Sequence, residues 1–149
     1  MENINQLKRD LTYNYIYEIQ NIEANNESKI KFFTEDIILH ALICSVYEVG
    51  YKEFSLIKDL TFENLYEDCE RYVSDLPNSL QSPIVLNAAI VLIEHFVNSL
   101  NGQSRLSRSI ISSTKDPLGE LEVNLEGYKS CYDEIIKDLK QNPSENGLS

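Results

Sequence analysis

Apolar side chains cover almost the whole circumference of a helix that the sequence predicts over residues 82–101. Its polar residues Asn87, Glu94 and Asn98 fall within about 40° of one another on a helical wheel. A helix that is apolar nearly all round is normally surrounded by other helices. The apolar run is about half of the ~20 residues that a membrane span requires, so we expect no span. The pattern predicts a central buried helix over 83–100 in a soluble helical domain.

Both ends of this central helix carry sequence signals. Ser82 can accept a hydrogen bond from the first free backbone N–H groups, and Pro83 suits the first helical position because it has no N–H to lose. Asn101 and Gly102 tolerate the left-handed conformation that often closes a helix. The sequence thus predicts an N-cap at Ser82 and an end at Asn101.

Four more stretches are predicted to be helices: 1–25, 34–50, 61–76 and 116–140. The stretch 34–50 is apolar nearly all round, and the other three space their apolar residues by about three and four, as a helix requires. The apolar set of the first stretch is Ile4, Leu7, Leu11, Tyr15, Ile19 and Ile22. Tyr13 and Tyr17 fall on its opposite side. In the second stretch, Thr34 is a predicted N-cap and Gly50 a predicted stop.

No segment shows the alternation of a strand. Residues 51–60 fit a short helix or turn, and the Ser-rich, basic residues 103–115 fit a loop. We expect an all-α fold in which one domain over 1–140 forms a bundle of five main helices with one or two short ones. Residues 141–149 are predicted to be a flexible polar tail.

The composition adds one unusual feature, a formal net charge of −11. Nucleic acid and anionic lipid membranes are polyanionic, so we expect this chain to bind neither. Between Phe32 and Leu76, ten acidic residues stand against three basic ones. The N-terminal residues lack the basic and apolar runs of a secretory signal. Three widely spaced cysteines in apolar patterns are typical of reduced core thiols, which favours a cytoplasmic location.

Candidate chemistry is sparse. Asp36, His40 and Cys44 follow one another at four-residue steps and could ligate a metal together, but zinc needs further ligands and supporting contacts. We therefore interpret His40 as a half-buried histidine above core residues and expect no metal site and no cofactor. Glu94 and His95 point about 100° apart on a helix, so they do not naturally serve one catalytic centre. No catalytic motif is present, and we expect no enzyme, although an enzyme or metal protein using these residues is an alternative.

The acidic residues are the strongest functional signal. Like charges at four-residue spacing cost a few tenths of a kcal/mol each, a repulsion that a basic partner would relieve and that a merely solvated face also tolerates. The predicted protein-binding residues are Asp59, Glu63, Glu67, Asp68 and Glu70, joined by Tyr13 and Tyr17 and by Glu122 and Glu126.

In size and acidity, though not in any motif, the chain resembles bacterial immunity proteins and antitoxins, which are small acidic inhibitors of basic toxins. That resemblance implies a protein partner, namely a basic toxin of the nuclease type. The alternative is an adaptor or regulatory helical module, in which acidity serves only solubility. An oligomer formed through exposed tyrosines belongs to that alternative.

Overall fold

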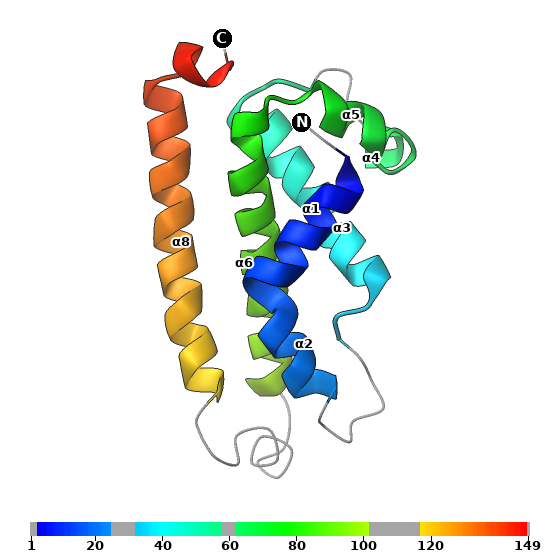
Figure 1. Cartoon of the computed structure of the whole chain (residues 1–149), viewed down its shortest axis with the longest axis vertical. Coiled ribbons are helices and arrows are strands. Elements are labelled where there is room, and N and C mark those ends of the chain that lie inside the picture. Colours follow the sequence, from blue (N-terminus) through cyan, green and yellow to red (C-terminus); the bar gives the residue numbers. More distant parts are fainter. Residues whose placement is uncertain (1–2, 25–31, 58–61, 102–116, 149) are drawn as a thin grey trace.

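The computed structural model describes residues 3–24, 32–57, 62–101 and 117–148 (Figure 1). Every regular element in these ranges is helical, so the prediction of an all-α fold is confirmed. In chain order the elements are α1 (Ile4–Leu11), η1 (Thr12–Ile16), α2 (Tyr17–Ala24), α3 (Glu35–Val46), η2 (Tyr47–Glu53), α4 (Phe62–Glu67), α5 (Cys69–Asp75), η3 (Asn78–Leu80), α6 (Gln81–Asn101), α8 (Pro117–Gln141) and η4 (Ser144–Asn146).

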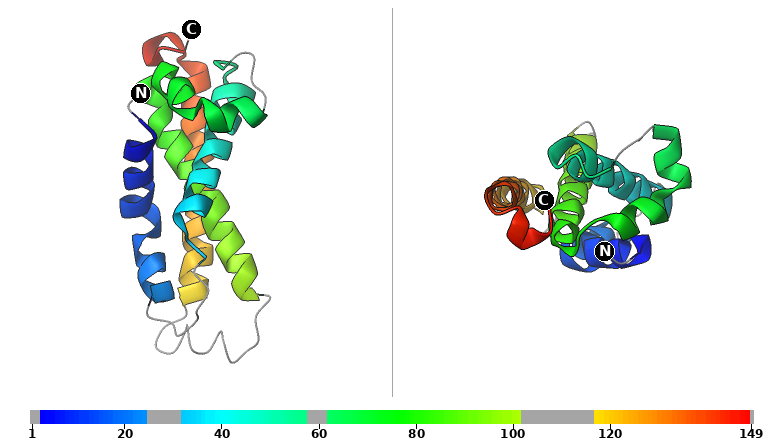
Figure 2. Two further views of the ribbon diagram at one scale, coloured as in Figure 1. Left: turned by 90° about the vertical axis from the view of Figure 1, so that its right-hand side faces the viewer. Right: turned by 90° about the horizontal axis from the view of Figure 1, so that it is seen from above.

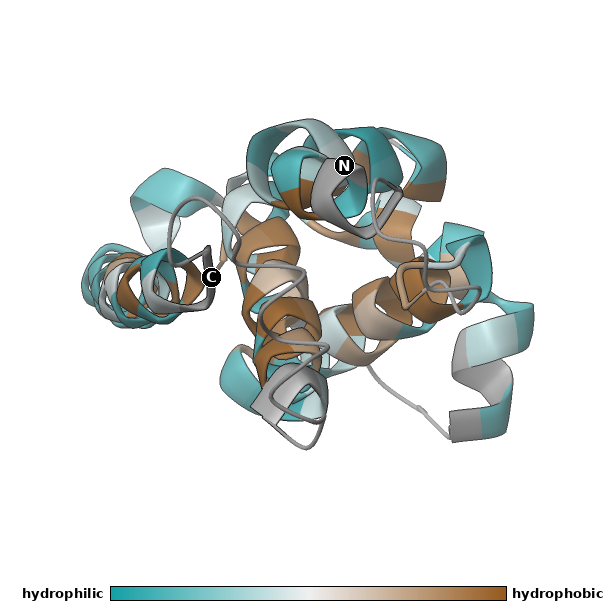
Figure 3. Cartoon of the chain, turned by 90° about the horizontal axis from the view of Figure 1, so that it is seen from below, coloured by the Kyte–Doolittle hydropathy of each residue, from teal (hydrophilic) through white to brown (hydrophobic). Residues whose placement is uncertain are grey.

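Helix α6 occupies the centre of the bundle, as the sequence predicts. It packs against α3, α8 and α1, and the view from above places it between α8 and the other helices (Figure 2). Ile84, Ala88 and Leu92 on this helix are almost completely buried. Hydrophobic residues colour most of α6, whereas hydrophilic residues predominate on α8 (Figure 3).

The segment Asn78–Ser99 is long and apolar enough to cross a membrane by length and composition alone. However, 67% of its most apolar window is buried inside the structure. A helix in a protein core can have the same length and composition, because the protein interior and the membrane both favour apolar side chains on every face of a helix. The burial of this segment among α1, α3 and α8 therefore accounts for its hydropathy.

The central helix predicted over 83–100 is confirmed, but the N-cap predicted at Ser82 is wrong. The short 3₁₀ turn η3 leads directly into α6, which begins at Gln81, so Ser82 is an exposed residue of the first turn. Pro77 sets this start, because its extended backbone precedes η3 and its carbonyl accepts a hydrogen bond from Leu80 N at 3.1 Å. Pro83 remains acceptable there, since first-turn N–H groups have no partner within the helix.

The second predicted helix begins as expected and ends differently. Thr34 caps α3, and its hydroxyl accepts a hydrogen bond from Ile37 N at 3.2 Å. Gly50 does not stop the helix, because the chain continues as the wider π-helical turn η2. A Cβ atom on Gly50 would lie 2.8 Å from Ile57 Cδ1, so this glycine allows close packing. The chain reverses at Ser55, whose φ is 55°.

A second π-helical turn, η1, joins α1 and α2 into one continuous rod. A π-turn carries one extra residue, and this shifts the register of the apolar face. Ile16 is consequently fully buried, while Tyr15, which the spacing placed in the core, is half-buried. Tyr13 and Tyr17 lie on the side opposite the apolar face, as predicted, and both are exposed.

The last described residues of the chain contact the rest of the fold and do not form a fully exposed tail. Ser79 Oγ donates a hydrogen bond of 2.7 Å to the carbonyl of Asn146, and Leu148 packs against the hydrophobic core. The flexibility predicted for residues 141–149 stays a prediction.

The prediction that Cys131 lies in the core is wrong, because Cys131 is exposed on α8, whereas Cys69 is buried on α5.

Candidate protein-binding surface

Four of the predicted binding residues lie on the consecutive short helices α4 and α5 or at the junction between them, and we name them the acidic edge: Glu63, Glu67, Asp68 and Glu70. The two helices are separated at Asp68, whose backbone leaves the helical region at φ −108° and ψ 19°. Glu63, Glu67 and Glu70 are exposed, and Asp68 is half-buried. Asp59 lies outside the described residues, as does the basic loop predicted over 103–115.

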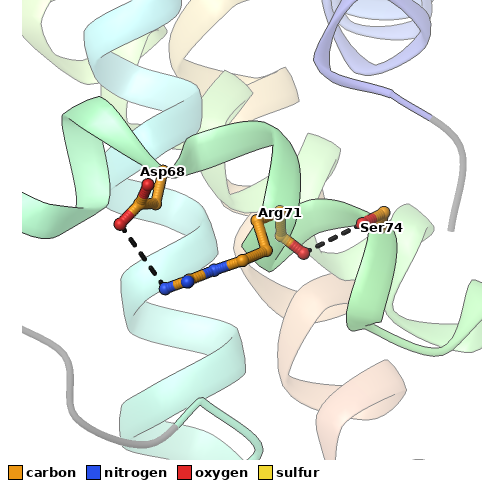
Figure 4. Close-up of polar contacts among 3 residues, drawn as sticks. All are labelled: Asp68, Arg71 and Ser74. Carbon is orange, nitrogen blue, oxygen red and sulfur yellow. Dashed lines mark hydrogen bonds and ion pairs between the residues drawn. The ribbon is translucent and has the colours of Figure 1, made fainter.

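Two carboxylates of the acidic edge have partners within the fold. Asp68 Oδ2 accepts a hydrogen bond from Arg71 Nη2 at 3.4 Å, and Ser74 Oγ donates to the Arg71 carbonyl at 2.9 Å (Figure 4). A hydrogen bond with Tyr72, followed by the nearby Asp68 carboxylate, raises the pKa of Arg71. Glu70 Oε2 accepts from Ile4 N at 3.5 Å, where a carboxylate favours the positive end of the α1 dipole.

The other two carboxylates differ. Glu63 and Glu67 lie four residues apart on α4, and neither forms an ion pair with any residue in the described ranges. Tyr66, between them in sequence, points its hydroxyl to His40 instead. No cation among the described residues therefore offsets the repulsion between Glu63 and Glu67.

Lysines neutralise two further carboxylates of the acidic segment. Glu48 pairs with Lys52 at 3.6 Å, and Glu53 pairs with Lys140 of α8 at 2.6 Å. Glu35, Asp36 and Asp75 are exposed and, among the described residues, have no ion-pair partner. The acidic segment is thus less uniformly charged on the surface than along the chain.

The exposed tyrosines form a separate feature. Tyr13 and Tyr17 are 74% and 53% exposed, and their rings stack with centroids 6.5 Å apart. They lie between two clefts, and both rings line each cleft. One, of about 290 Å³, is bounded across from them by Leu121, Asn124 and Tyr128 of α8. The other, of about 410 Å³, is bounded by Lys8, Arg9, Thr12, Gln20, Phe33, Glu35 and Ile38.

The structure does not bring all the predicted residues onto one surface. Helices α4 and α5 lie on the opposite side of α6 from α8 (Figures 1 and 2). Glu122 and Glu126 are exposed on α8, seven and three residues before Lys129, which faces Glu94 of α6. Helical spacing places them on the side of Lys129, whereas Asn124 faces the tyrosine cleft. The acidic edge, the tyrosine pair and the α8 carboxylates are three distinct surfaces.

His40 occupies a different environment from the half-buried position that the sequence indicated. It is exposed on α3, its Nδ1 is hydrogen-bonded to the Tyr66 hydroxyl of α4, and the two rings stack with centroids 5.9 Å apart. Cys44 Sγ lies 3.5 Å from His40 Nε2. Burial raises the pKa of the Cys44 thiol. Sequence reasoning missed Tyr66, because the contact joins residues 26 positions apart.

The three residues considered as possible metal ligands, Asp36, His40 and Cys44, do not all come together. Asp36 is exposed on α3 and has no described contact with His40 or Cys44. Across the described ranges, no group of three or more His, Cys, Asp or Glu side chains is close enough to hold a metal ion. His40 and Cys44 therefore form a pair.

The polar residues of α6 connect helices. Glu94 Oε1 accepts from Lys129 Nζ at 3.1 Å, and His95 beside it is exposed, so the two do not converge on one site. Asn87 Nδ2 donates to Ser45 Oγ at 3.2 Å, which in turn donates to the Ile84 carbonyl at 2.5 Å. The stripe predicted on α6 thus reaches both α8 and α3.

The sequence matches no protein-family model and no curated protein, and the fold matches no solved structure. The function is therefore argued from the surface of this chain alone.

Proposed function

We propose that this chain is a non-enzymatic, acidic protein-binding inhibitor that docks a basic protein on the acidic edge of α4 and α5. The observation that carries the proposal is the pair Glu63 and Glu67, exposed at four-residue spacing without a described counter-ion. A cationic partner would relieve their repulsion and would leave the Asp68–Arg71 and Glu70–Ile4 contacts in place.

The net charge of −11 also supports binding to a basic protein. A strong field of one sign steers an oppositely charged protein toward the surface and raises the association rate at low salt. Exposed carboxylates can also occupy cationic sites that bind phosphate in nucleases. The most concrete form of the proposal is a cytoplasmic bacterial immunity protein that neutralises a basic, nuclease-type toxin, and that binds neither nucleic acid nor membrane.

The test is co-expression with the product of the neighbouring gene, followed by association kinetics if that product is a basic toxin. We expect growth rescue by the wild-type chain and an association rate that falls steeply with salt. The double substitution Glu63→Lys/Glu67→Lys should abolish rescue. The matched control Glu122→Lys/Glu126→Lys changes the net charge equally on α8, and should retain rescue with a modestly lower association rate.

Equal loss of binding in both variants would show that only net charge matters and would remove the acidic edge as the docking site. Full rescue by Glu63→Lys/Glu67→Lys would have the same consequence. Circular dichroism of both variants establishes that each remains helical, so that a loss of binding is assigned to the surface.

A second candidate function is an adaptor or self-associating module that uses the tyrosine pair. The stacked, exposed rings of Tyr13 and Tyr17 between two clefts favour it, because exposed aromatic side chains are enriched at binding hot spots. Analytical ultracentrifugation of the wild type and of Tyr13→Ala/Tyr17→Ala distinguishes the two. An oligomer that dissociates only in the tyrosine variant supports the adaptor.

A further inference from the structure

His40 and Cys44 lie one turn apart on the accessible side of α3, and the spacing of their ligand atoms suits a metal ion. His40 Nε2 and Cys44 Sγ are 3.5 Å apart. A tetrahedral zinc ion, bound to nitrogen at about 2.1 Å and to sulfur at about 2.3 Å, holds these two atoms about 3.6 Å apart. The observed pair therefore already has the separation that a shared metal would impose.

The second nitrogen of the same imidazole is also engaged. His40 Nδ1 is hydrogen-bonded to the Tyr66 hydroxyl, which fixes the orientation of the ring and leaves Nε2 directed to Cys44. Metal-binding histidines almost always use their other ring nitrogen in this way, because the outer contact selects the tautomer and orients the ligand. Tyr66 would be a positioning residue and would not touch the metal.

We propose that His40 and Cys44 form a two-ligand surface site for Zn²⁺, with Tyr66 as the outer hydroxyl that orients His40. Water fills the remaining coordination positions. A thiolate paired with an imidazole selects zinc and related transition metals over Mg²⁺ and Ca²⁺, which prefer oxygen ligands. The exposed edge of His40 leaves the site open to solvent.

Binding exchanges a proton for the metal. The Cys44 thiol releases one proton to solvent as its sulfur bonds to Zn²⁺, and neutral His40 contributes the Nε2 lone pair while its Nδ1–H donates to Tyr66.

Cobalt is the probe, since Co²⁺ substitutes for zinc and a cobalt–thiolate bond gives a charge-transfer absorption band. Titration of the reduced full chain with Co²⁺ should produce this band with one equivalent bound, and Zn²⁺ should bleach it. Cys44→Ser should abolish the band, and His40→Asn should weaken binding at least tenfold. Tyr66→Phe should weaken binding about tenfold while keeping the band, as expected for an outer contact.

Cys131→Ser is the matched control, because Cys131 is an exposed thiol on α8 without a described histidine beside it. This variant should bind Co²⁺ like the wild type. The proposal is overturned if the wild type shows no thiolate band, if the band survives Cys44→Ser, or if Cys131→Ser removes it. Helical content of each variant, measured by circular dichroism, excludes unfolding as the cause of a lost band.

Discussion

The ammonium group of Lys129 on α8 lies 3.1 Å from the Glu94 carboxylate on α6, and this ion pair links the central helix to the last one. The two side chains are 39% and 46% exposed. A pair of this exposure gains little net free energy, because water screens both charges and ordering two long side chains costs entropy. The contact therefore adds little to stability, and α8 is held mainly by its core residues Leu121, Leu125 and Leu139.

We predict that Glu94→Gln and Lys129→Met each lower the free energy of unfolding by less than about 1 kcal/mol. A double-mutant cycle measured by urea denaturation should give a coupling energy of about 0.5 kcal/mol, smaller at high salt. A coupling energy above about 2 kcal/mol would contradict this and would mean that the pair is desolvated.

Gly50 and Gly127 offer a matched pair of substitutions. At Gly50 an added Cβ would lie 2.8 Å from Ile57 Cδ1 and 3.4 Å from Leu76 Cδ2, both on buried side chains, so the core must shift. We expect Gly50→Ala to destabilise the protein by about 1–2 kcal/mol.

Gly127 is exposed in the middle of α8, and a Cβ there meets nothing within 4 Å among the described residues. Gly127→Ala should therefore stabilise the protein by up to about 1 kcal/mol through helix propensity. Thermal denaturation of both variants checks the opposite signs. Destabilisation by both, to the same extent, would show that Gly50 is not a site of close packing.

Local patterns determined the parts of the fold that could be read from the sequence. Thr34 was recognisable as a cap because the cap depends on a single side chain and the next three residues. The position of Tyr13 and Tyr17 opposite the apolar face followed from helical periodicity alone. The all-round apolar surface of α6 indicated its central position, because such a helix needs neighbours on every side.

The features that the sequence missed depend on contacts between distant residues. The π-turns, which bury Ile16 and carry the helix past Gly50, respond to tertiary packing and have no sequence signal of their own. Tyr66 reaches His40 across 26 residues, and Lys129 reaches Glu94 across 35. For the same reason, the sequence could group acidic and aromatic candidates but could not show that they lie on separate surfaces.

Tyr132 on α8 has a buried hydroxyl without a hydrogen-bond partner in the described part of the chain. Burial, and then the nearby Glu53 and Glu48 carboxylates, raise the pKa of this phenol. An unsatisfied buried hydroxyl costs free energy, so its removal should not be harmful.

We predict that Tyr132→Phe leaves the free energy of unfolding unchanged or raises it by up to about 1 kcal/mol. The control is Ser45→Ala: the Ser45 hydroxyl is also buried, but it donates to the Ile84 carbonyl and accepts from Asn87, so its removal should be destabilising. Urea denaturation at neutral pH measures both. A loss above about 1 kcal/mol in Tyr132→Phe would reveal a hydroxyl partner outside the described residues.

The Cys69 thiol predicts how stability responds to alkaline pH. Burial, with a smaller contribution from the Glu70 carboxylate, raises its pKa from 9.0 to about 11. Above about pH 9 the unfolded chain loses this proton while the folded chain keeps it, so the unfolded state binds fewer protons. Stability that is fully present below pH 9 should therefore decline between pH 9 and 11.

Cys69→Ala removes this titration, and urea denaturation under reducing conditions from pH 8 to 11 should show a flatter profile for this variant between pH 9 and 10. Both proteins should still lose stability above pH 10, because burial also raises the pKa of Tyr15, Tyr128 and Tyr132. Cys131→Ala, which removes an exposed thiol, should follow the wild-type profile. Identical slopes for the wild type and Cys69→Ala between pH 9 and 10 would mean that the Cys69 thiol ionises equally in the folded and unfolded states.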